Sequence, residues 1–228
     1  MHISTVCRAF SVLVVPTLLT LGVPSAHAQQ QNTQPQPRDL GWVSALAGTT
    51  FGSQTQTAAT FAGEYGDDVH PRVQAHVTIS YFDNLLTQDF EDDLSALSAG
   101  LTAVSGTTWS LHGRDRAVTM IVGGRYLLAT QGTYRPYIGG GGGVINLRRT
   151  ITDPRAGNVT AAVLNEFGVG DFSMVGQSLT RPLLEAALGV GVYRGPVYVD
   201  IGYRFNRAYH LSEPLDISRV AVGIGYKF

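Results

Sequence analysis

The C-terminal stretch SRVAVGIGYKF, residues 218 to 228, decides the fold of this chain. Its bulky apolar side chains fall on alternate residues and so on one face of a β-strand: Val220, Val222, Ile224, Tyr226 and Phe228. The opposite face is small or charged and includes Arg219, Gly223 and Lys227. This division is typical of a strand that separates hydrocarbon from the lumen of a membrane-spanning barrel.

The same alternation recurs upstream, most clearly in VYVDIGYRF at residues 197 to 205. No run of 18 or more apolar residues follows Leu40, which argues against a helical span. We therefore expect an all-β, eight-stranded, antiparallel, up-and-down transmembrane barrel. The expected strands are residues 40–52, 58–66, 73–81, 118–128, 134–149, 184–192, 197–206 and 218–228.

Connection lengths give independent support for this topology. The turns expected at one end are short, at residues 67–72, 130–133 and 194–196. The opposite connections are residues 53–57, 83–116, 150–181 and 207–217, and two of them are the longest in the chain. Outer-membrane barrels show this asymmetry, with short periplasmic turns and longer outer loops. A soluble barrel is the alternative, but its surface would be rich in Gly and Ala and poor in charge.

The N-terminus predicts export. Residues 1–28 are expected to be a signal peptide, with Arg8 before an apolar stretch and Ala26-His27-Ala28 as the cleavage site. Residues 29–39 are expected to be a flexible periplasmic leader, and residues 40–228 the barrel. Cys7 is the only cysteine, so the mature chain would have no thiol. A formal net charge of −1 without a Lys/Arg run argues against nucleic acid as a partner.

Three motifs carry a family resemblance: the terminal YKF, GGRYLLATQGTYRPYIGGGGGV at 123 to 144, and VYVDIGYRF. With them the chain resembles the small bacterial outer-membrane β-barrel superfamily of the OmpA, OmpX and OmpW type. The resemblance implies an outer-membrane location and a last strand that the barrel-assembly machinery reads as its assembly signal. Outer-membrane lipid and lipopolysaccharide are the other expected partners, and a monomer is expected. Because the superfamily includes adhesion, structural, transport and lipid-modifying proteins, it implies no single activity.

Charged residues at inward positions suggest what fills the lumen. The predicted ion-pair network consists of Glu64, Arg125, Glu185, Asp200, Arg204, Arg219 and Lys227, with His76 on the same face. An eight-stranded barrel is just wide enough for side chains to fill, so these groups should pair across it. Such a plug favours a structural or surface-interaction role. The alternative is a narrow porin-like path for small solutes, with inward glycines leaving room for water.

The long connection at 83–116 predicts an amphipathic helix. Leu86, Phe90, Leu94, Leu97, Leu101 and Val104 recur at helical spacing, and acidic residues stand near the N-terminal end. Its apolar stripe should pack on the barrel rim or the other long loop; a partner-binding or membrane-lying role is the alternative.

An enzymatic alternative rests on His210 and Ser212, whose spacing resembles that of lipid A deacylases, outer-membrane acyl hydrolases. Glu213 and Pro214 follow the serine here, where those enzymes have Asn, so no enzyme is expected. The histidines lack metal-ligand spacing, and Gly139–Gly143 is followed by no helix start that could bind phosphate. We therefore expect no catalytic, metal-binding or cofactor-binding residues.

Overall fold

The structure is a computed structural model that describes residues 41–51, 57–159, 175–209 and 214–228. The expected signal peptide and leader lie outside the described residues. The elements are β1 (Trp42–Phe51), β2 (Ala59–His70), β3 (Val73–Phe82), α1 (Gln88–Ser105), β4 (His112–Leu127), β5 (Tyr134–Asp153), β6 (Gly157–Val159), β7 (Ser178–Arg194), β8 (Val197–Ala208) and β9 (Leu215–Lys227).

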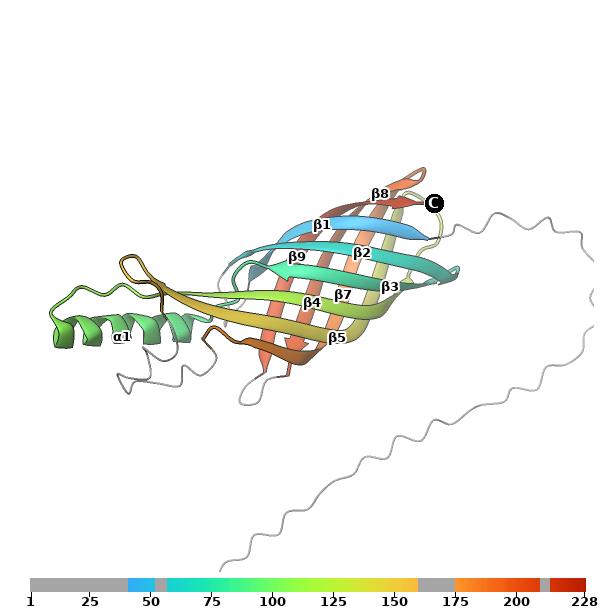
Figure 1. Ribbon diagram of the computed structural model, residues 1–228. Helices are drawn as coiled ribbons and strands as arrows, with labels where there is room; N and C mark the ends of the chain where they lie inside the picture. The colour runs from blue at the N-terminus through green and yellow to red at the C-terminus, as the bar shows by residue number, and fades with distance from the viewer. Residues whose placement is uncertain (1–40, 52–56, 160–174, 210–213) are drawn as a thin grey trace, which may run out of the picture. The chain divides into compact units, whose positions relative to one another are not determined.

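The strands form one antiparallel sheet that closes on itself (Figure 1). The order is β4-β3-β2-β1-β9-β8-β7-β5, and pairing of β4 with β5 completes the ring, while the short β6 only adds to the end of β5. The predicted eight-stranded antiparallel barrel is therefore confirmed. We call the end where β1 begins and β9 finishes the terminus end, and the opposite end the loop end.

The outer wall of the barrel is apolar and the inner wall contains the charges. Ile224 and Ile201 on the outer face are 61% and 44% exposed, whereas Arg204 and Asp200 on the inner face are each 1% exposed. Outward aromatic residues stand near both ends of this apolar belt: Phe51, Phe61 and Tyr81 at the loop end, and Tyr65, Tyr126, Tyr134, Tyr226 and Phe228 at the terminus end. This arrangement requires hydrocarbon around the barrel, so the chain is a transmembrane barrel of the outer-membrane type.

Several strands extend beyond their predicted limits. β4 begins at His112 and β5 continues to Asp153, so parts of the expected loops 83–116 and 150–181 are strand. β2 likewise continues to His70, which shortens the turn expected at 67–72. The long strands persist because Leu111 and Ile151 are buried beneath α1. We call α1, β6 and the parts of β4 and β5 up to Arg116 and from Arg148 onward the extension.

The helix α1 confirms the prediction of a helix in this connection. Thr87 caps its N-terminus by accepting a hydrogen bond from the backbone N–H of Phe90, and Gly106, at φ +67°, ends it. Its buried face is Leu94, Leu97 and Leu101, which form a hydrophobic core with four residues of other segments: Leu111 just before β4, Ile151 on β5, Val159 on β6 and, after β6, Val175. Val104 is 83% exposed, so its predicted place on the apolar stripe is wrong.

The helix is too polar to be a membrane span. Within the part of the chain that the structure describes, no helix is both long and apolar enough to cross a bilayer.

Candidate functional site in the barrel lumen

A chain of alternating charges crosses the middle of the lumen. Glu64 is held between Arg125, with which it forms an ion pair, and Arg204, whose Nη2 lies 2.9 Å from its Oε2. Arg204 also contacts Glu185 at 3.5 Å, and Glu185 contacts Arg219 at 3.4 Å. We call these five residues and Asp200 the ion-pair network. Its three arginines and three carboxylates leave it without net charge.

Asp200 connects two parts of the network. Its Oδ2 lies 4.0 Å from Arg125 and 3.8 Å from Arg204, and it accepts a hydrogen bond of 3.1 Å from the hydroxyl of Tyr137. Glu64 is further fixed by the hydroxyl of Thr78 at 2.9 Å. These partners offset the cost of burying six charges away from bulk water.

The network arises because strands that are not neighbours point the same kind of side chain inward. Glu64 is on β2 and Arg204 is on β8, with β1 and β9 between them in the wall, so their contact spans the lumen. Six of the seven residues predicted for the network lie together in this way. Lys227 does not: it lies at the terminus end, where its Nζ contacts Asp68 at 2.7 Å.

Aromatic rings close the lumen at the terminus end. The guanidinium of Arg125 lies between the rings of Trp42 and Tyr137, 4.7 Å from each centroid. Tyr198 meets Trp42 edge-on at 6.1 Å and stacks with Tyr193 at 4.9 Å. The residues of this aromatic layer are not among those predicted for the lumen network. The inward parity of Tyr198, which it shares with Asp200, was the available signal.

A compact apolar cap closes the loop end. Its buried members come from six strands and the segment after β3: Phe82, Leu85, Ala117, Ile121, Ile145, Leu183, Ala208 and Ile217. Phe82 joins the cap to the network, because the guanidinium of Arg219 lies 5.4 Å from its ring centroid. The expectation that inward positions are small or charged is wrong at this end. Apolar contacts among side chains replace ion pairs where the network stops.

Some buried polar groups beside the network have no hydrogen-bond partner in the protein. Among the described residues they include both ring nitrogens of His76 and both amide atoms of Asn206. Unpaired polar groups in a protein interior are commonly satisfied by buried water. The lumen is therefore filled by side chains, with room for hydration at particular points.

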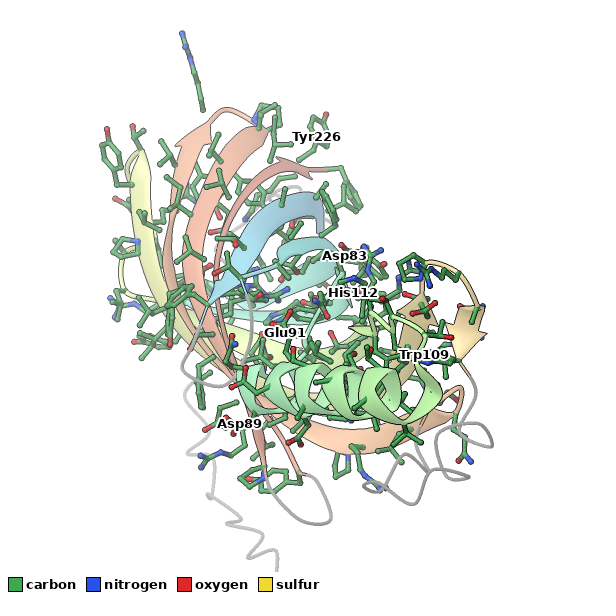
Figure 2. All side chains as sticks on the ribbon, turned by 90° about the vertical axis from the view of Figure 1, so that its left-hand side faces the viewer. Asp83, Asp89, Glu91, Trp109, His112 and Tyr226 are labelled. Atoms are coloured by element: carbon green, nitrogen blue, oxygen red, sulfur yellow. The ribbon has the colours of Figure 1, made fainter. Side chains whose placement is uncertain are left out.

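The proposed hydrolase pair, His210 and Ser212, lies outside the described residues. A different Ser–His contact occurs near α1, where Oγ of Ser110 lies 3.2 Å from Nε2 of His112. Figure 2 labels His112 in this region. The nearby carboxylate of Asp153 accepts hydrogen bonds from backbone N–H groups, including that of Ser110 at 2.9 Å. The described contacts of Asp153 thus do not orient the imidazole for base catalysis.

Comparison with known proteins supports the fold. No family profile matches the sequence. No curated protein matches it significantly. Among solved structures, the chain is similar to Neisserial surface protein A, at 14% identity and a TM-score of 0.55 over 82% of this chain and 97% of that one.

Two further solved structures have lower scores. The N-terminal barrel domain of OprF from Pseudomonas aeruginosa has 12% identity and a TM-score of 0.49, over 85% of this chain and all 100% of that one. Ail, the attachment invasion locus protein of Yersinia pestis, has 9% identity and a TM-score of 0.46, over 82% and 96%. The similarity to the Neisserial protein supports the barrel fold.

Proposed function

We propose that this chain is an integral outer-membrane barrel with a structural or surface-interaction role, which displays the extension outside the cell and does not conduct solutes or catalyse a reaction. The observation that carries this proposal is the filling of the lumen in three successive layers. The aromatic layer, the ion-pair network and the apolar cap each consist of buried side chains that meet inside the barrel.

The extension supports the interaction role. It has a hydrophobic core of its own, so the surface that it presents is ordered rather than a set of loose loops. Both ends of the barrel sequence lie at the terminus end, which faces the periplasm in outer-membrane barrels. This general orientation supports the proposed display of the extension on the cell surface.

A narrow porin-like path is the second candidate, and the polar groups without partners favour it. His76 and Asn206 lie on the inner wall, and water bound to such groups could form part of a path. The apolar cap opposes this candidate, because a dry constriction at the loop end would block water and ions.

Conductance measurements in planar bilayers distinguish these two candidates. The refolded mature protein should show no discrete current steps, and Ile121→Ala should leave it silent because the ion-pair network remains beneath the cap. Val122→Ala, on the outer face of the same strand, is the matched control. Discrete current steps from the parent protein would contradict this proposal and support the porin-like path.

Cysteine labelling on intact cells tests the orientation. Val104 on α1 is 83% exposed and Val69 at the terminus end is 62% exposed. A membrane-impermeant maleimide should label Val104→Cys on intact cells but Val69→Cys only after the outer membrane is permeabilised. The reverse pattern would contradict surface display of the extension.

A further inference from the structure

Two arginines face each other on the outer surface just beyond the apolar belt. Arg116 on β4 and Arg148 on β5 are direct cross-strand partners, and both are exposed. Side chains opposite each other in an antiparallel pair lie about 5 Å apart at Cβ, and like charges there are destabilising. An anion bound between the two guanidinium groups, which we call the arginine doublet, would relieve this repulsion.

Neighbouring arginines show the contrast. Arg114 forms an ion pair with Asp83, and Arg207 contacts Asp216 at 2.7 Å. The carboxylate of Asp83 is also close enough to interact with Arg116. The pKa of Asp83 is lowered mainly by its hydrogen bond from Arg114, and the charge of Arg116 makes a smaller contribution. Among the ion pairs of the described residues, neither member of the doublet takes part.

The acidic end of α1 lies on the other face of these strands. The helix packs against Leu111 and Ile151, which have the inward parity of Asp115 and Arg149, whereas the doublet has the outward parity. Arg149 points inward, forms an ion pair with Asp115 at 2.6 Å, and lies over the ring of Phe90. The outer face of the extension is thus left basic, with its acidic helix shielded behind the strands.

The depth of the doublet relative to the belt is fixed by the register. The next outward pair toward the belt is Val118 and Asn146, followed by Met120 and Val144. Two residues along a strand span about 6.8 Å, so the doublet lies one step above the first lipid-facing valine. That is the depth of lipid headgroups rather than of hydrocarbon or bulk water.

From this position we infer that the arginine doublet binds a phosphate group on the headgroup of an outer-leaflet lipid. Arginine binds phosphate bidentately, and two guanidinium groups match a doubly charged phosphate monoester. Ser178, which opposes Arg148 on β7, and Thr180, which hydrogen-bonds Asn146 at 2.9 Å, supply polar groups on the same face. A lipid phosphate is favoured over a free one because its acyl chains would lie against the belt below. The inference rests on the proposed surface orientation.

Native mass spectrometry of the refolded full-length mature protein tests the inference, with diphosphorylated and dephosphorylated lipid A as probes. The parent should retain the diphosphorylated form at least tenfold more than the dephosphorylated form. Arg148→Glu should reduce that retention about tenfold while preserving the fold, because the new carboxylate pairs with Arg116. Arg207→Gln, which alters an arginine already paired at the same rim, is the matched control and should change retention less than twofold.

The outcomes separate this inference from the proposed function. Equal retention by Arg148→Glu and the parent would overturn it, as would displacement of the lipid by millimolar inorganic phosphate, which would indicate a free-anion site. Arg116→Glu is the mirror variant and should behave as Arg148→Glu does. If the parent itself fails to give a heat-modifiable folded form in bilayers, the proposed function fails instead.

Discussion

Replacing Glu64 by glutamine should destabilise the barrel by about 3–5 kcal/mol, which is the usual cost of leaving a buried charge without its partner. Glu64 forms ion pairs with Arg125 and Arg204 and accepts a hydrogen bond from the hydroxyl of Thr78. Its side chain is inaccessible to solvent. Glu64→Gln leaves three buried guanidinium groups against two carboxylates, so the network acquires a net positive charge. Urea unfolding of the protein in lipid vesicles, followed by tryptophan fluorescence, measures the loss.

Two further variants make this test specific. Glu64→Gln with Arg125→Gln restores neutrality, so the double variant should lose less than the sum of its single variants, as expected for coupled residues. Asp216→Asn removes a carboxylate from the half-exposed pair with Arg207 and should cost less than about 1 kcal/mol. A cost for Glu64→Gln no larger than that of Asp216→Asn, or strict additivity in the double variant, would refute the reasoning.

Three other predictions follow from the wall and the extension. Gly143→Ala should sharply reduce the heat-modifiable folded form on gels, because the added Cβ would overlap the backbone of β4 at Met120 and Ile121, whereas Gly142→Ala meets only ordinary contacts and should fold normally. Leu97→Ala should destabilise the extension by about 2–5 kcal/mol and expose α1 to limited proteolysis while the barrel stays folded, with the exposed Val104→Ala as an unaffected control. Hydrogen bonds from the backbone N–H groups of Ser110, Arg155 and Ala156 hold the pKa of Asp153 below its usual range. The stability that these bonds contribute is complete above the unfolded-state pKa and is lost as the pH falls through the lower folded-state pKa. The backbone amide NMR signals of Arg155 and Ala156 should therefore shift below about pH 4 and stay constant at neutral pH.

Alternation predicted the wall of the barrel because lipid and lumen impose a local rule at every residue. Val220 and Arg219 occupy opposite faces whatever the rest of the chain does, so period two was sufficient to orient them. The same parity correctly placed Glu64, Arg204 and Arg219 on the inner wall. It could not specify partners, since the contact of Glu64 with Arg204 depends on how the strands are staggered around the closed ring.

Depth along the barrel was the second quantity that parity could not supply. Lys227 has inward parity but lies at the terminus end, too far along the axis to join the network, and pairs with Asp68. Ile121 stands in an apolar run where both faces are apolar, which hides its place in the cap. The strand segments of the extension lie in connections predicted as loops, and their packing under α1 explains why they remain strands.

The hydrophobic core beneath α1 and the apolar outer wall of the barrel depend on different solvents. The core beneath α1 is assembled from leucines that exclude water, and the hydrophobic effect stabilises it as in a soluble domain. The barrel wall exposes its apolar side chains outward, so detergent or lipid must solvate this surface for the closed barrel with its charged interior to form. A detergent that solvates the apolar wall weakly should therefore unfold the barrel first. The contacts among the leucines of α1 do not depend on detergent, but α1 would lose the β4 and β5 strands against which it packs.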